Sequence, residues 1–85
     1  MTFKERFHRL MSKLGLSVDQ LAEIFGVSYD TMLDWTLGKT IPQHEFRMTL
    51  LRLELEHLPK LSPHLRADTL AAFRAGQERV VLEEQ

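Results

Sequence analysis

The chain contains no cysteine, which excludes disulfide bridges and zinc sites built from cysteine ligands. It has no apolar run long enough to cross a bilayer, and its first residues, MTFKERFHRL, are charged throughout, unlike a signal peptide. A glycine-rich phosphate-binding loop is also missing. These absences predict a cytoplasmic protein that has no membrane partner.

Patterns that would indicate an enzyme are missing as well. The four histidines, at positions 8, 44, 57 and 64, do not share metal-ligand spacing on one helix. The serines occur where helix caps or helix faces explain them, and no general base with an orienting group accompanies them. We therefore expect no enzyme activity, no metal and no cofactor.

The composition is typical of one globular domain. The chain has 85 residues, of which 44% are hydrophobic and 27% charged. A domain of this size buries roughly 60% of the surface that its unfolded chain exposes. This is enough for one modest core, and dimerisation would add to it.

Positive charge is unevenly distributed along the chain. The net charge is −1, so there is no overall basic signature of nucleic-acid binding. Residues 1–16 have a balance of +3, whereas residues 17–38 contain four acidic residues and no base. Basic residues return from Lys39 onward, and residues 67–85 end acidic. Cations therefore flank the middle of the domain and are absent from it.

Capping residues and glycines divide the first half into three short helices. A hydroxyl residue precedes each apolar stripe and a glycine follows it. The expected N-caps are Thr2, Ser17 and Ser28, and the expected stops are Gly15, Gly26 and Gly38.

The second half predicts two longer helices. Pro42 suits the first turn of a fourth helix, which must end before Pro59. Ser62-Pro63 predicts the start of a fifth helix that frays or breaks near Gly76, and residues 79–85 (RVVLEEQ) fit either a helix or a short strand. The expected fold is all-α: a compact bundle of four to five helices, with a domain over residues 1–58 and a C-terminal helical segment over residues 59–85.

Several residues between positions 16 and 42 share a pattern with a known DNA-binding domain. They are Leu16-Ser17, Leu21-Ala22, Gly26-Val27-Ser28, Trp35, Gly38-Lys39 and Pro42. This string resembles the helix-turn-helix of the Cro/lambda-repressor-type (XRE-like) family, and the flanking helices extend the likeness to about residues 3–57. Ala22 must be small where two helices cross, Gly26 permits a positive φ in the turn, and Trp35 anchors the second helix.

The resemblance implies a transcriptional regulator, most simply a repressor from a phage, plasmid or bacterial operon. Its helix 29–37 would read an operator in the major groove of double-stranded DNA. The implied base contacts are Ser28, Tyr29, Asp30, Thr31 and Asp34, and the implied phosphate contacts are Lys4, Arg6, Arg9, Lys39 and Arg47.

Family members of this type bind two-fold operators as homodimers. The dimer interface is expected on the fourth and fifth helices, with Leu65, Leu70, Phe73, Val80, Val81 and Leu82. The alternative is that the fifth helix closes the core of the monomer.

The chain departs from the family pattern on its outer surface. Val18 and Thr36 stand where glutamine and glutamate are common, and Leu33 and Leu37 stand at usually polar positions. These residues support an alternative in which the same surface binds a protein, such as another regulator, through an apolar patch. That patch would consist of Val18, Tyr29, Leu33 and Leu37, rimmed by Asp30 and Asp34.

Overall fold

The chain folds into helices joined by short loops. The computed structural model describes residues 2–58 and 62–84, and the side chains of residues 2–58 and 62–77. The helices of these segments are α1 (Phe3–Leu14), α2 (Val18–Phe25), α3 (Tyr29–Leu37), α4 (His44–His57) and α5 (Pro63–Glu84). Within the described segments there is no strand, which confirms the predicted all-α bundle.

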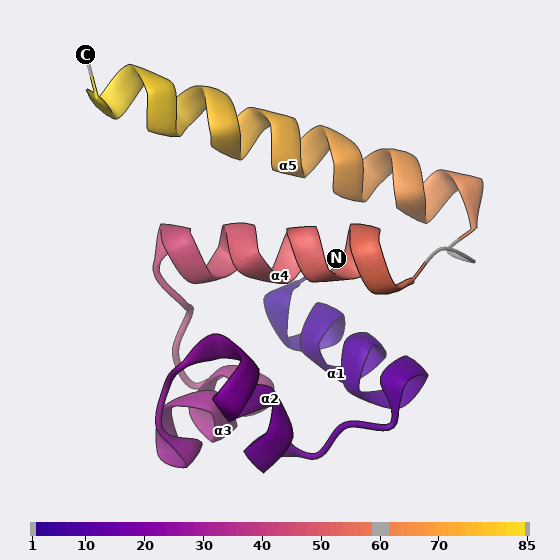
Figure 1. Ribbon diagram of the computed structural model, residues 1–85, viewed down its shortest axis with the longest axis vertical. Coiled ribbons are helices and arrows are strands. Elements are labelled where there is room, and N and C mark those ends of the chain that lie inside the picture. Colours follow the sequence, from indigo (N-terminus) through magenta and orange to yellow (C-terminus); the bar gives the residue numbers. More distant parts are fainter. Residues whose placement is uncertain (1, 59–61, 85) are drawn as a thin grey trace.

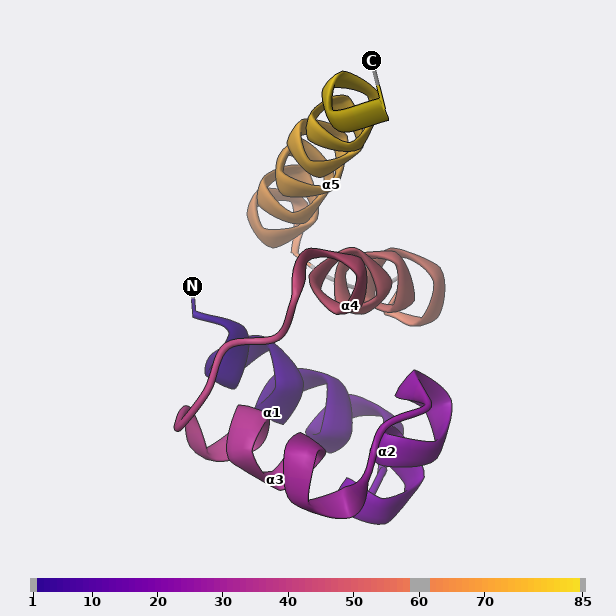
Figure 2. The same ribbon diagram turned by 90° about the vertical axis from the view of Figure 1, so that its left-hand side faces the viewer.

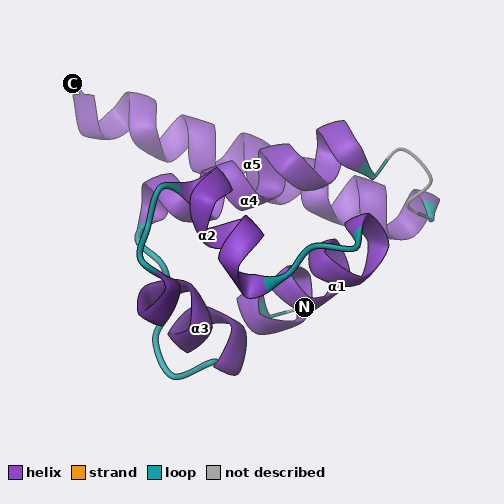
Figure 3. Ribbon diagram, turned by 60° about the horizontal axis from the view of Figure 1, so that its bottom comes forward, coloured by secondary structure: helices purple, strands orange, loops and turns teal. Residues whose placement is uncertain are grey.

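The helices form three levels (Figures 1 and 2). α1, α2 and α3 pack together at one side, α4 lies across them, and α5 covers the opposite side of α4. α4 therefore separates α5 from α3. Figure 3 shows the loops that connect α1 to α2, α2 to α3 and α3 to α4. None of the described helices has the length and apolar character needed to traverse a bilayer.

The predicted caps of the first three helices are confirmed. The side chains of Thr2, Ser17 and Ser28 each accept a hydrogen bond from the backbone N–H three residues later. Gly26 adopts φ 70°, a left-handed conformation that lets the chain turn directly from α2 into α3. The local sequence signals thus set the ends of α1, α2 and α3.

Two predictions about the later helices are wrong. Pro42 lies ahead of α4 instead of in its first turn: it is buried, Gln43 after it is still extended, and the helix begins at His44. α5 does not break near Gly76 but runs through it to Glu84, which also assigns residues 79–84 to a helix. The reason lies in packing, because a Cβ built on Gly76 would overlap the sulfur of Met48. Gly76 allows α5 to approach α4 closely.

Trp35 is the centre of an aromatic cluster that joins four helices. Its ring stacks on Phe7 of α1 at a centroid distance of 6.1 Å. It contacts Phe25 of α2 edge-on at 6.3 Å and Phe46 of α4 at 5.2 Å. Each such aromatic pair contributes roughly 0.5–1.5 kcal/mol beyond its area burial. Trp35 thereby fixes the orientation of α3 against the other three helices, as the sequence predicted for this residue.

A buried carboxylate joins α1 to α4. Glu54 of α4 is fully buried, and its two oxygens accept hydrogen bonds from Arg6 Nη1 at 2.6 Å and from Arg9 Nη2 at 2.7 Å. The same Arg6 nitrogen donates to Thr69 of α5 at 3.0 Å, and Asp68 lies 3.4 Å from Arg6 Nη2. Polar contacts therefore connect the expected C-terminal segment with the first and fourth helices.

Replacing Glu54 by alanine is expected to destabilise the fold strongly. The substitution removes the buried charge partner of Arg6 and leaves only the longer contact with the exposed Asp68. Removing one partner of a buried pair costs roughly 3–5 kcal/mol. Such a loss is a large share of the roughly 5–15 kcal/mol typical of whole domains, so the milder Glu54→Gln should be measured beside it. Urea denaturation followed by circular dichroism measures the free energy of unfolding.

The matched control is Glu56→Ala, two residues further along α4. Glu56 is exposed, and its only ion pair within the described part of the chain is a 3.9 Å contact with the neighbouring His57. We expect this substitution to change the free energy of unfolding by less than about 0.5 kcal/mol. Equal losses for Glu54→Ala and Glu56→Ala would show that the buried pair does not hold the helices together.

Candidate nucleic-acid interface

α3 turns one side into the core and presents the other outward. Its buried residues are Met32, Trp35 and Thr36. Outside this buried set, Tyr29 and Leu37 are 47% and 48% exposed. Because residues four apart share a helix face, Tyr29 and Leu37 belong to one row along the outside of α3. Leu33, between them in the row, is half-buried, so the row is most accessible at its two ends.

The acidic residues of α3 lie beside that row. Asp30 is exposed and Asp34 is half-buried, and they are also four residues apart. Neither makes an ion pair within the described residues. Their carboxylates can therefore accept hydrogen bonds from an external partner.

The N-terminus of α3 limits what two of the predicted base contacts can do. Ser28 Oγ accepts from the Thr31 N–H at 3.2 Å and donates to Thr31 Oγ1 at 2.9 Å. The Ser28 hydroxyl therefore donates its proton within the helix cap and cannot donate it to a base at the same time. The Thr31 hydroxyl keeps its own proton, and this half-buried group can donate outward.

The C-terminus of α3 is held by residues of α1. His8 Nε2 lies 2.8 Å from the carbonyl oxygen of Thr36 and donates to it, since a carbonyl can only accept. The Lys4 side chain lies against Gly38, where a Cβ would stand 3.3 Å from Lys4 Cδ. The last turn of α3 has no basic residue of its own. Lys4 therefore supplies the positive charge that favours a helix C-terminus.

Lys4 and Lys39 are the predicted phosphate contacts that remain accessible. Both are exposed, and both lie at the end of α3, since Lys39 follows Gly38 directly. The candidate interface thus combines an acidic and apolar helix face with two lysines at one end.

Arg6 and Arg9 are not available as phosphate contacts in this structure, and their predicted role is corrected. Arg6 is 5% exposed, and both guanidinium groups are engaged with the buried carboxylate of Glu54. Moving either side chain to a phosphate would leave that carboxylate with a missing partner, which is unfavourable in the interior.

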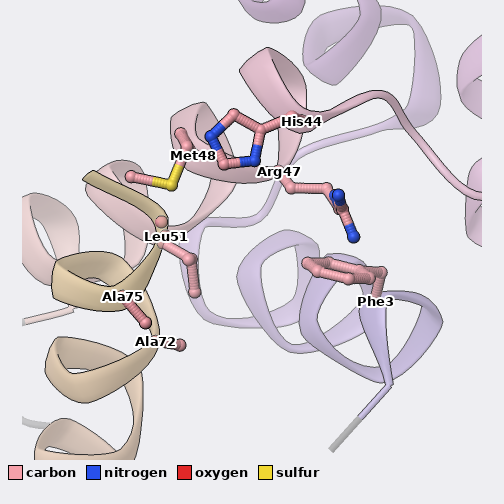
Figure 4. Close-up of a pocket in the computed structure, with 8 residues that line it drawn as sticks. Phe3, His44, Arg47, Met48, Leu51, Ala72 and Ala75 are labelled. Atoms are coloured by element: carbon pink, nitrogen blue, oxygen red, sulfur yellow. The ribbon is translucent and has the colours of Figure 1, made fainter. Parts of the chain in front are cut away.

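Arg47 also lies away from the face of α3. Its guanidinium carbon stands 5.6 Å from the centre of the Phe3 ring, in a cation–π contact. Figure 4 shows the side chain over this ring, and Arg47 lines a cleft that includes residues of α5. The Arg47 side chain is thus directed toward Phe3 and the cleft, and its contact with a phosphate stays a prediction.

The structure describes the side chains of only some of the residues expected in the dimer interface. Leu65, Leu70 and Phe73 are partly buried within α5, which packs on α4 of the same chain. Val80, Val81 and Leu82 lie in α5, but their side chains fall outside the described residues. The packing of α5 on α4 agrees with the alternative in which α5 closes the monomer.

Two functional contacts were not predicted from the sequence, although a signal existed for one. Arg6 continues the inward row of Phe3, Phe7 and Leu10, and a charged residue in such a row indicates a buried partner. The contact between His8 and Thr36 joins two helices through residues that are 28 positions apart in the sequence, and no local sequence pattern predicts it.

Comparisons with protein-family models, curated proteins and solved structures find no match for this chain. The helix-turn-helix resemblance thus stays a prediction that rests on the residues quoted for it.

The substitution His8→Ala is expected to loosen the end of α3. It leaves the Thr36 carbonyl without its donor, and a net loss of about 1 kcal/mol is typical for one hydrogen bond. Amide hydrogen exchange should quicken at Leu37 and Gly38 in particular, because the last turn of α3 frays first. His57→Ala, at an exposed histidine of α4, serves as the control. Identical exchange in both variants would contradict a positioning role for His8.

Proposed function

We propose that this protein is a DNA-binding transcriptional regulator of helix-turn-helix type, which inserts α3 into the major groove. One observation carries the proposal. The inner face of α3 is fixed by Trp35, whereas its outer polar side chains are accessible and two exposed lysines stand at its end. A rigid helix with one free polar face and adjacent cations is the form in which such domains read base edges.

The chemistry of the face favours contacts to cytosine. Asp30 and Asp34 can accept a hydrogen bond from cytosine N4, and Thr31 can meet a base edge or a thymine methyl group. Near a phosphate or a base acceptor the same carboxylates are repelled. Selectivity would therefore depend as much on rejecting wrong sequences as on contacts to the right one.

Phosphate binding by Lys4 and Lys39 sets the expected salt dependence. Each neutralised phosphate contributes about −0.9 to the slope of log K against log salt. A dimer that engages both lysines of each chain would give a slope of about −4. Repression of a two-fold operator fits this picture, since one chain supplies few cations.

Selection of duplexes from a random library, followed by salt titration of the best binder, tests the proposal. Lys4→Ala and Lys39→Ala should weaken binding to all sequences alike and lower the slope by about 1 for each phosphate that is no longer neutralised. Arg66→Ala is the matched control, because this exposed arginine lies on α5, beyond α4 from the candidate interface. A library that yields no enriched sequence at low salt would overturn the proposal.

Base preference provides a second and independent test. Asp34→Ala should relax the preference at one base pair by about 1–3 kcal/mol while leaving the salt slope unchanged. Repeating the selection with the variant measures this directly. A preference that is unchanged by Asp34→Ala would place this residue outside the contact.

A second candidate function is favoured by the apolar residues on and beside α3. Tyr29 and Leu37 are exposed, and Ile41 after the helix is 73% exposed. Val18, expected in the same patch, packs against the core instead. The remaining row would suit a protein partner such as another regulator, with Tyr29 as an anchor. In that case Tyr29→Ala abolishes binding of the partner, whereas Lys39→Ala leaves it intact.

A further inference from the structure

A cleft lies on the other side of α4, between α4, α5 and the start of α1. It has a volume of about 260 Å³ and opens to solvent. Its apolar walls come from three helices, as Figure 4 shows. They consist of Phe3, Met48, Leu51, Ala72, Ala75 and Gly76.

Two nitrogen atoms in this cleft lack a hydrogen-bond partner. His44 Nε2 and Arg47 Nε are each buried, and neither makes a hydrogen bond within the described residues. Unsatisfied buried donors are unfavourable unless water or a ligand completes them. Both residues lie in the first turn of α4, where Gln43 provides no side-chain cap. The free N–H groups of this turn add partial positive charge beside the two nitrogens.

No described acidic residue lines the cleft. Arg47 is held by the face of Phe3. The Phe3 ring thus contacts the flat face of the Arg47 guanidinium. The N–H groups at the edge of the guanidinium remain free to donate to an acceptor. The result is a small cavity with apolar walls and one cationic end.

We propose that this cleft binds a small organic anion, namely a carboxylate with a short aliphatic chain. The carboxylate accepts hydrogen bonds from Arg47 and from His44, and the aliphatic chain packs between Leu51 and the alanines of α5. Such a ligand supplies the missing hydrogen-bond acceptor to the nitrogens of His44 and Arg47. Its aliphatic chain at the same time covers the apolar walls of the cleft. The cleft shares no lining residue with the face of α3, although Phe3 in its wall precedes Lys4 in α1.

Titration of the isotopically labelled full chain with sodium butanoate tests the proposal. We expect saturable shifts of the backbone amides at residues 44–48 and 72–76, with a dissociation constant on the order of 1 mM. Butanamide has the same shape without the charge, and it should bind roughly tenfold or more weakly, since charge-assisted hydrogen bonds are the stronger ones. Equal affinity for the amide, or shifts confined to Lys4 and Lys39, would overturn the proposal.

Three variants separate the cleft from a general charge effect. Arg47→Gln should weaken butanoate binding roughly tenfold or more, because it removes the cation. Arg52→Gln removes a cation from an exposed position of the same helix and should leave the affinity unchanged. If Arg47→Gln disturbs folding through the loss of its contact with Phe3, Ala72→Leu provides the second test. It fills the cleft and keeps the charge, and unchanged binding by this variant would also overturn the proposal.

Discussion

The carboxylate of Glu54 is the group on which the arrangement of the helices depends. It has no exposed surface, and two arginines of α1 satisfy its oxygens. Burying such a group is unfavourable, and the ion pairs only offset that loss when their geometry is good. The pair therefore adds less to the stability of the domain than its short distances suggest. Its effect is to disfavour any other packing of α1 on α4, because every alternative leaves a buried charge alone.

The same carboxylate shapes the electrostatics of the candidate interface. It keeps Arg6 and Arg9 from the surface, so a sequence with a balance of +3 over residues 1–16 presents fewer cations than its composition suggests. Among the predicted phosphate contacts, Lys4 and Lys39 remain accessible, and they lie at the end of the helix that carries Asp30 and Asp34. A surface of this kind binds weakly through charge alone, so the fit of its side chains to a particular partner decides the affinity.

Local signals in the sequence predicted the first half of the fold well. Ser17, Ser28 and Gly26 act through bonds and dihedrals within a few residues, so their roles can be inferred without knowledge of the tertiary structure. The start of α4 and the continuity of α5 depend instead on packing: Pro42 is drawn into the core, and Gly76 is fixed by Met48 of another helix. The accessible cations could not be inferred from residue type. Whether an arginine is free depends on what faces it, and Glu54 is 48 positions away from Arg6.

α1 is the element that touches both surfaces of the molecule. Phe3 lines the cleft under Arg47, and Lys4 beside it lies on Gly38 at the end of α3. One turn further, His8 holds the carbonyl of Thr36. A displacement of Phe3 in the cleft would therefore move Lys4, the neighbouring residue on a rigid helix, relative to the end of α3. Glu54 anchors α1 at Arg6, between these contacts, and this buried ion pair resists such a movement. The same ion pair therefore keeps the residues of both surfaces in a fixed arrangement.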